Sequence, residues 1–318
     1  MIFITGASGF VGKSLVDNLK RKNIEHKVGL RNSAVSISST EKEFVIGDIS
    51  ETTDWSFALH KVEVVIHLAA RVHVMDDKRN SLTEFRNVNT YATLKLAKQA
   101  VQAGVKRFIF ISSVKVNGEM TTLNRAFTPD DQYIPDDPYG LSKYEAEQGL
   151  LLLAKETDME VVIIRPPLVY GPGVRANFAS MMKWINRGVP LPLGAINNHR
   201  SLIALDNLVS FIIHCIDHPK AANEVFLISD THDVSTTELL QKVAKAFDKK
   251  VWLIPMPVSL MTYFARLIGK GDISSRLFAS LQIDSSKACE LLDWKPVITM
   301  DQQLKKSADA YLNNEKTI

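Results

Sequence analysis

Two side chains near the middle of the chain have the types and spacing to move a proton together. Tyr139 and Lys143 stand four residues apart in the run Tyr-Gly-Leu-Ser-Lys. On a helix, residues with this spacing share one face, so a phenol and an ammonium can act on the same ligand. A free tyrosine titrates near about 10, and a nearby ammonium lowers that pKa by stabilising the phenolate. The pair therefore predicts proton exchange near neutral pH.

The first residues carry a glycine pattern that suits a phosphate-bearing ligand. A short apolar strand over residues 2–5 runs into a turn with Gly6, Gly9 and Gly12. Such glycines let the backbone approach a pyrophosphate, which the N-terminus of the next helix binds. The spacing Gly-x-x-Gly-x-x-Gly differs from the commoner fingerprint, so its place between a strand and a helix matters. The turn predicts a dinucleotide site; a purely structural turn is the alternative.

The residue after the second predicted strand bears on which dinucleotide binds. A carboxylate usually holds the ribose hydroxyls of NAD at this position, whereas this chain has Arg31. The charge and forked donors of a guanidinium suit a 2′-phosphate, so NADP(H) is favoured and NAD(H) is the alternative. Arg31 as a solvated loop residue or an adenine-stacking group also stays open. Asp48 is expected to accept from the adenine amino group, or to be a plain turn aspartate.

A third group is expected to complete a site for hydride chemistry. Ser113 follows an apolar run that ends in Ser112, and a long polar loop leads from there to Tyr139. We expect Ser113 to hydrogen bond a substrate oxygen, Tyr139 to exchange its proton, and Lys143 also to hold the nicotinamide ribose.

Positioning these groups requires parallel strands that end at one edge of a sheet. The predicted strands are residues 2–5, 27–30, 62–68, 108–112 and 161–165, and the predicted helices are residues 12–22, 87–103 and 139–155. This alternation predicts an α/β fold, a Rossmann-type doubly wound parallel sheet, with ligands at the carboxyl ends of the strands. We expect a dinucleotide-binding domain over residues 1–170, with the sheet completed by about residues 200–230. Residues 171–318 should mainly form a smaller C-terminal substrate-binding lobe, although 224–228 reads as one more sheet strand.

The composition argues against several other classes of protein. The formal net charge is only +3, and lysine and arginine are scattered, so a nucleic-acid surface is unsupported. The two cysteines have no metal-like spacing, and we predict no metal site. They suit a reduced, cytoplasmic compartment, and Met1 leads directly into the first strand without a secretory leader. No apolar run approaches the roughly 20 residues of a membrane span, so no membrane insertion is expected.

Taken together, the motifs resemble those of the extended short-chain dehydrogenases/reductases, in the branch of nucleotide-sugar epimerases, dehydratases and reductases. The resemblance covers nearly the whole chain. It includes Thr-Gly-Ala-Ser-Gly-Phe-Val-Gly from Thr5, His-Leu-Ala-Ala from His67, Asn-Val-Asn from Asn87, Ser-Ser from Ser112, the Tyr139 and Lys143 pair, and Arg-Pro-Pro-Leu-Val-Tyr-Gly-Pro from Arg165. Within the branch, the chain is most similar to a subgroup often labelled UDP-glucose 4-epimerase-like, which includes UDP-4-keto-6-deoxy-N-acetylhexosamine 4-reductases.

The resemblance implies further site residues. Beyond the groups already named, cofactor contacts are expected from Ser8, Phe10, Val11, Ile49, Leu68, Ala69, Ala70, Asn87, Ser112 and Pro166. Substrate contacts are expected from Ser113, Lys115, Asn177, Leu191, Leu193, Arg200 and Arg276. Asn87 is expected to orient the cofactor-side network. Arg200 resembles the diphosphate-binding arginine, whereas the spacing around Arg276 fits the family poorly, so its role as a second clamp stays open.

Departures from the family pattern shape the expected reaction. Where 4,6-dehydratases carry an Asp-Glu pair, this chain has Val114 and Lys115, so dehydration is not expected. Leu168 replaces a usual asparagine and removes one polar substrate contact. We expect NADPH-dependent reduction of a nucleotide-linked, UDP-type 4-keto-6-deoxy sugar at C4, for bacterial surface polysaccharide. The alternative is an NAD-dependent UDP-hexose or UDP-N-acetylhexosamine 4-epimerase. A homodimer through residues 87–103 and 139–155 is also expected.

Overall fold

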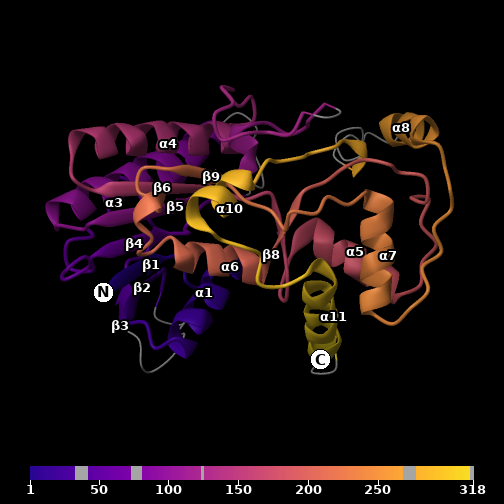
Figure 1. The fold of residues 1–318 in the computed structure, drawn as a ribbon, viewed down its shortest axis with the longest axis horizontal. Coiled ribbons are helices and arrows are strands. Elements are labelled where there is room, and N and C mark those ends of the chain that lie inside the picture. The colour runs from indigo at the N-terminus through magenta and orange to yellow at the C-terminus, as the bar shows by residue number, and fades with distance from the viewer. Residues whose placement is uncertain (33–41, 73–80, 123–124, 268–276, 316–318) are drawn as a thin grey trace.

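A parallel sheet of seven strands runs through the larger end of the molecule (Figure 1). The computed structural model describes residues 1–32, 42–72, 81–122, 125–267 and 277–315. The strands are β1 (Ile2–Thr5), β2 (His26–Leu30), β3 (Lys42–Val45), β4 (Val64–His67), β5 (Arg107–Ile111), β6 (Glu160–Arg165) and β9 (Val225–Leu227). Their order is β3-β2-β1-β4-β5-β6-β9, and every neighbouring pair is parallel. This arrangement brings the carboxyl ends of β1, β4, β5 and β6 to one edge.

Helices cover both faces of this sheet because its strands are apolar on both sides. In β1, Phe3 belongs to one buried cluster and Ile4 to the other, as alternation along a strand requires. One face holds α1 (Phe10–Arg21) and α6 (Leu205–His214), with α10 (Ser286–Leu292) nearby. The other face holds α3 (Ala92–Gln102) and α4 (Pro138–Glu156). The predicted Rossmann-type α/β fold is confirmed.

Several elements after residue 168 form a second group of packed helices (Figure 1). Strands β7 (Leu168–Tyr170) and β8 (Leu202–Ala204) make a separate two-stranded sheet. Around their own buried cluster pack α5 (Ala176–Asn186), α7 (Thr236–Ala246) and α11 (Met300–Glu315), while α8 (Val258–Leu267) lies at the end of the molecule. The chain returns to the main sheet through β9, at the position predicted for residues 224–228. Among the described residues, no helix is both long and apolar enough for a membrane span.

Several elements differ from those expected from the sequence. Strand β3 was not predicted, because it is a short edge strand that begins with the charged residues Lys42 and Glu43 and lacks a long apolar run. The expected helix over residues 87–103 begins earlier and is divided between α2 (Ser81–Phe85), a π-helical turn η1 (Arg86–Tyr91) and α3. Short 3₁₀ turns, η2 (Val114–Val116) and η3 (Pro219–Ala221), were also not expected.

Candidate active site

The glycine turn closes tightly between β1 and α1. Gly6 has a φ of +71°, a conformation that disfavours side chains with a Cβ, and its carbonyl accepts from the Gly9 N–H at 2.9 Å. A Cβ at Gly12 would lie 2.1 Å from the Gly6 oxygen. Gly9 is the N-cap of α1, so the free N–H groups of that helix begin at the turn. The turn thus has the backbone geometry that its sequence predicts.

A cavity of about 310 Å³ lies beside this turn. It is lined by Thr5, Gly6, Ser8, Gly9, Gly29, Leu30, Arg31, Asn32, Ile46, Gly47, Ile49, Trp55 and Ala69. Trp55 is one of these lining residues, and its buried Nε1 has no hydrogen-bond partner within the described part of the chain. Polar backbone, one cation and an unpaired indole N–H fit the adenosine and phosphate end of a dinucleotide. The expected cofactor residues Phe10, Val11, Leu68 and Ala70 are not among the lining set, although Phe10 and Val11 open α1.

Arg31 and Asp48 contact each other at the mouth of the cavity. The Arg31 Nε lies 3.0 Å from Asp48 Oδ1, and both side chains are largely exposed. Of these two residues, only Arg31 lines the cavity. Such an exposed pair contributes at most about 1 kcal/mol, so a ligand phosphate can compete for the guanidinium at small cost. The pairing shows that the roles expected for these two residues are not independent.

Tyr139 and Ser113 meet at the carboxyl edge of the sheet. Asp137 caps α4 by accepting from the Gly140 N–H at 3.1 Å, which places Tyr139 in the first turn of the helix. Burial, followed by the Asp137 carboxylate, raises the pKa of Tyr139 to about 12, while a hydrogen bond with Ser113 acts in the opposite direction. The expected lowering of this pKa by Lys143 is therefore wrong for the protein alone, because burial and the Asp137 carboxylate determine its direction. The phenol is protonated at neutral pH.

Lys143 is buried one turn further along α4. Its Nζ donates to the Ile111 carbonyl at the end of β5 at 2.9 Å, and it lies 4.4 Å from the centre of the Phe110 ring. Burial lowers the pKa of Lys143 to about 7, although the carboxylate of Glu147 opposes this change. The ammonium therefore titrates in the physiological range. Because the Ile111 carbonyl immediately precedes Ser112 and Ser113, the lysine and both hydroxyls lie at one strand end.

A network of hydrogen bonds joins this helix to the segment that follows β4. The Asn89 amide accepts from the Arg71 N–H at 2.8 Å and donates to the Arg71 carbonyl and to Ser142 Oγ, both at 3.0 Å. Ser142 Oγ in turn donates to the Tyr139 carbonyl at 2.8 Å. Asn87, which was expected to orient this network, is exposed. The expectation is corrected to Asn89, because the π-helical turn directs this second asparagine of Asn-Val-Asn inward.

One buried ion pair and two hydrogen bonds of the same arginine hold α4 and its loop in place. Arg165 Nη2 and Glu147 Oε2 are 2.6 Å apart, with Glu147 fully buried. The same guanidinium donates to Asn117 Oδ1 at 3.1 Å and to the Pro129 carbonyl at 3.2 Å. One arginine thus ties the end of β6 to the Tyr139 helix and to the loop between Ser113 and that helix. Pro166, which is expected beside the nicotinamide, directly follows Arg165 in the sequence.

Lys115 is held by carboxylates beside Ser113. Its Nζ lies 2.6 Å from Glu119 Oε1 and 3.2 Å from Asp137 Oδ1, and its backbone N–H donates to Ser113 Oγ at 3.3 Å. The side chain expected to contact substrate is therefore paired with Glu119 and with Asp137, the carboxylate that raises the pKa of Tyr139. The sequence did not indicate this cluster, because Asp137 lies 22 residues away from Lys115.

The residues expected to bind substrate occupy different surroundings. Asn177 is exposed at the start of α5, and Arg200 is partly buried, with its Nη1 donating to the Ala279 carbonyl at 3.1 Å. The side chain of Leu191 is buried, and its backbone pairs with the chain around Leu253, so that its N–H and carbonyl are already used. The carbonyl of Leu193 accepts from Thr237 Oγ1 at 2.6 Å. Arg276 lies outside the described residues.

The segment 279–283 links the chain around Arg200 to the loop that follows Ser113. Ser201 donates its N–H to the Leu281 carbonyl at 2.8 Å, and Phe127 donates to the Gln282 carbonyl at 2.8 Å. Leu281 also packs with Val114, the neighbour of Ser113. This strand-like segment therefore contacts both the chain around Arg200 and the loop after Ser113.

His67, which begins the His-Leu-Ala-Ala motif, is a residue whose importance sequence reasoning did not recognise. Its ring nitrogens lie 2.6 Å from Thr5 Oγ1 and 2.9 Å from Thr93 Oγ1, and its ring stacks on Phe110. Burial, followed by the positive charge of Lys143, lowers the pKa of His67 to about 3. The imidazole is therefore neutral at neutral pH and joins β1, β4 and α3.

This burial predicts a loss of stability in mild acid. Between pH 6.5 and about 3 the unfolded chain binds a proton on His67 that the folded chain does not. The free energy of unfolding should therefore fall as pH drops below 6.5, by up to about 1.4 kcal/mol per pH unit. Urea unfolding between pH 5 and 7 measures the slope. His67→Gln should flatten it, whereas the exposed control His232→Gln should not; equal slopes in all three proteins would contradict the assignment.

Comparisons with known proteins agree with this geometry. The NAD dependent epimerase/dehydratase family matches residues 2–229. A Vibrio cholerae protein named UDP-glucose 4-epimerase is 50% identical over 98% of this chain and 95% of its own length. An Escherichia coli dTDP-4-dehydro-6-deoxyglucose reductase is 24% identical, over 96% of this chain and 95% of its own. The solved UDP-glucuronic acid 4-epimerase of Bacillus cereus, in complex with NAD, has a TM-score of 0.78 at 23% identity, with 98% of each chain covered. The chain belongs to the NAD dependent epimerase/dehydratase family and is a nicotinamide-dependent enzyme of nucleotide sugars, an epimerase or a reductase.

Proposed function

We propose that the protein is an NAD-dependent 4-epimerase of a UDP-hexose or UDP-N-acetylhexosamine. The observation that supports this most is the meeting of Ser113, Tyr139 and Lys143 at the end of β5, on the same edge of the sheet as the glycine turn. These are the groups that both epimerisation and reduction at a sugar C4 require. The half-identical relative is named an epimerase, which favours epimerisation over the reduction expected from the sequence.

In this proposal the protein moves the proton of the C4 hydroxyl. A bound nicotinamide supplies the acceptor and donor of hydride at that carbon. Tyr139 exchanges the hydroxyl proton, and Ser113 orients the same oxygen. Because burial raises the pKa of Tyr139 to about 12, proton removal needs added positive charge, which a protonated Lys143 can provide.

The second group of helices is proposed to hold the nucleotide. We assign residues 1–170, with β9, to the dinucleotide and residues 171–318 mainly to the nucleotide sugar. Arg200 is the proposed diphosphate ligand because its guanidinium is partly buried beside the segment that leads to the loop after Ser113. Asn177 is exposed at the start of α5 and is proposed as a second polar contact.

A second candidate is NADPH-dependent reduction of a UDP-4-keto-6-deoxy sugar. Arg31 at the cavity favours this reaction, since a reductase exchanges a consumed NADPH while an epimerase retains its NAD. The two reactions leave different cofactors on the purified protein. Denaturation followed by chromatography of the released dinucleotide is therefore the first test.

Activity assays complete this test. Retained NAD together with interconversion of UDP-glucose and UDP-galactose, or of their N-acetylated forms, would support the epimerase. Stoichiometric oxidation of NADPH by a UDP-4-keto-6-deoxy-N-acetylhexosamine, without epimerisation, would replace it with the reductase. Ser113→Ala serves as the site control, because it removes one hydroxyl from the shared machinery and should reduce whichever reaction is present.

Arg31 predicts a measurable effect on cofactor preference. If the guanidinium binds a 2′-phosphate, Arg31→Ala should weaken NADPH binding at least roughly tenfold, the loss of one charge-assisted contact, and leave NADH nearly unchanged. Asp48→Asn is the matched variant, because it frees the same guanidinium from its partner and should strengthen NADPH binding. Calorimetric titration of both dinucleotides measures these constants. Equal weakening of both dinucleotides by Arg31→Ala would remove the argument for NADP.

We also propose that the protein is a homodimer through α3 and α4. Leu152 on α4 and Tyr91, just before α3, are large, exposed side chains on the two neighbouring helices. An exposed apolar face of this kind is typical of a subunit interface. Light scattering at micromolar concentration should give twice the mass of the chain, and Leu152→Glu should give the monomer. A monomeric wild-type protein would refute the interface.

A further inference from the structure

The end of the molecule remote from the sheet carries exposed apolar side chains. Trp184 on α5 is 49% exposed, Trp252 after α7 is 71% exposed, and Ile254 is 51% exposed. The other two tryptophans, Trp55 and Trp294, are buried. Tryptophan side chains this exposed are costly in water, so their surroundings bear on what covers them.

Backbone pairing holds Trp252 and Ile254 on one outer face. The Leu191 N–H donates to the Trp252 carbonyl at 2.9 Å, and the Ile254 N–H donates to the Leu191 carbonyl at 2.8 Å. In this extended segment, alternate residues point to opposite sides. Leu253, between the two, packs against the buried cluster of the second helical group, so Trp252 and Ile254 point outward. Figure 1 shows the connection from α7 to α8 along the outer edge of the molecule.

Contacts between α5 and the chain after α7 bring Trp184 to the same region. Lys249 Nζ donates to Asn186 Oδ1 at 2.7 Å, so the end of α5 lies against the start of the Trp252 segment. Trp184 in the last turn of α5 and Arg187, which caps its C-terminal end, are both exposed. Three exposed cations, Arg187, Lys249 and Lys250, stand within three residues of Trp184 or Trp252 in the sequence.

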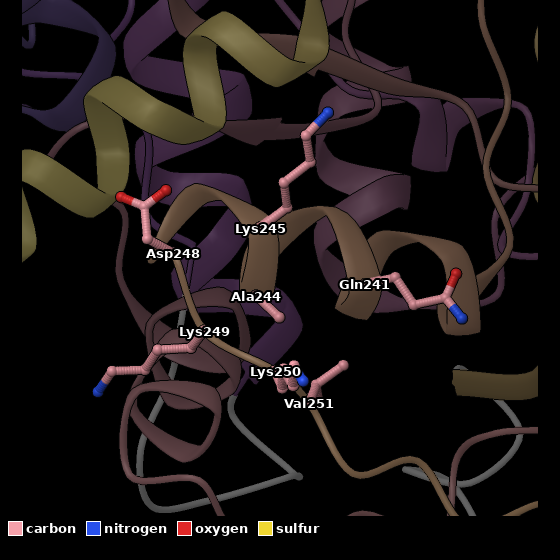
Figure 2. Close-up of a pocket in the computed structure, with 7 residues that line it drawn as sticks. All are labelled: Gln241, Ala244, Lys245, Asp248, Lys249, Lys250 and Val251. Atoms are coloured by element: carbon pink, nitrogen blue, oxygen red, sulfur yellow. The ribbon is translucent and has the colours of Figure 1, made fainter.

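The two segments that carry these side chains contain few acidic residues. The sequence has no aspartate or glutamate between Glu160 and Asp206, or between Asp248 and Asp272. Asp248 itself is paired with Lys305 at 2.9 Å. Figure 2 shows Lys245, Asp248 and Lys249 extending in different directions around the end of α7, beside a shallow hollow. Trp184, Arg187, Lys249, Lys250, Trp252 and Ile254 are called the basic aromatic surface below.

We propose that the basic aromatic surface docks on the headgroup region of an anionic lipid bilayer. Tryptophan favours the boundary between headgroups and acyl chains, and an aliphatic neighbour adds buried apolar area. Each lysine or arginine near an anionic leaflet adds about 1 kcal/mol of attraction. A second copy of the same surface would instead bring like charges together, which disfavours self-association through it. The docking is peripheral and goes beyond the proposed reaction.

The positions of the four tryptophans make the proposal directly measurable. Only Trp184 and Trp252 can change their environment on docking, because Trp55 and Trp294 are already buried. The full-length protein is titrated with vesicles of phosphatidylcholine alone and with vesicles containing phosphatidylglycerol. The expected result is co-sedimentation with the anionic vesicles only, with a blue shift of tryptophan emission and protection from acrylamide. Added salt should weaken the binding.

Charge-reversal variants distinguish binding through the basic aromatic surface from attraction by the overall positive charge of the protein. Arg187→Glu with Lys250→Glu should weaken partitioning roughly tenfold or more, since two attractive charges become repulsive. Lys22→Glu with Lys220→Glu makes the same net charge change at exposed sites on the sheet-bearing part and should change partitioning far less. Trp252→Ser should reduce both binding and the emission shift. Unchanged melting temperatures confirm that each variant is folded.

Three results would overturn the proposal. One is no binding of the wild-type protein to anionic vesicles at low salt. Another is equal loss of binding in the two charge-reversed pairs, which would show only attraction of the whole basic protein. The third is protection of the tryptophans without vesicles, either by self-association seen in light scattering or by an added single-stranded oligonucleotide. That outcome would assign the surface to a second copy or to nucleic acid.

Discussion

Tyr139→Phe should lose at least about 100-fold in turnover while still binding the dinucleotide. The change removes the proton-exchanging hydroxyl, and about 100-fold is the low end for one positioned proton donor. The aromatic ring is kept, so its edge contact with Phe85, at 5.9 Å between centroids, should survive. Steady-state kinetics with the natural nucleotide sugar measures turnover, and calorimetry measures dinucleotide affinity.

The control for this prediction lies on the same helix. Tyr144→Phe removes a phenolic hydroxyl five residues further along α4, away from Ser113, and should retain nearly full turnover. Lys143→Met should also lose turnover, and because the pKa of Lys143 is about 7, the wild-type rate should change across neutral pH. Near-normal turnover of Tyr139→Phe, in a protein that still binds cofactor, would rule out the assigned role.

Gly12→Ala should remove dinucleotide binding and destabilise the fold. A Cβ at this position would lie 2.1 Å from the Gly6 oxygen and 2.7 Å from the Ala7 Cα, both in backbone that cannot rotate away. The turn must therefore open, which costs about 1–3 kcal/mol as overpacking does and displaces the N–H groups at the start of α1. Urea unfolding measures the loss of stability. Titration with the dinucleotide measures its affinity, which is expected to weaken more than roughly tenfold.

The adjacent Lys13→Ala is the matched variant for this test. Lys13 is exposed on α1, so its replacement by alanine adds no clash and slightly favours the helix. It should bind dinucleotide as the wild-type protein does. If Gly12→Ala bound as tightly as Lys13→Ala, the tight turn would have no part in holding the cofactor.

Local sequence patterns were sufficient for the parts of the protein that depend on neighbours along the chain. The glycine turn, the apolar strands and the Tyr139–Lys143 spacing each depend on backbone geometry within a few residues, and each is present in the structure. Alternation of strands and helices then predicts the parallel sheet, because only that arrangement buries strands that are apolar on both faces. The edge strand β3 lacks this signal, since one side of it faces no neighbouring strand.

Contacts between distant residues were decided only by the tertiary structure. Asn89 rather than Asn87 enters the network because the π-helical turn sets which side chain faces inward. Lys115 is paired with Asp137, and Arg31 with Asp48, because the strand ends bring them together.

Burial likewise depends on the completed fold. It raises the pKa of Tyr139 although the neighbouring lysine alone would lower it. The sequence by itself therefore determined which chemical groups the protein has and where the backbone turns. Packing determined the charge state and the partners of those groups, because desolvation and long-range contacts exist only once the chain has folded.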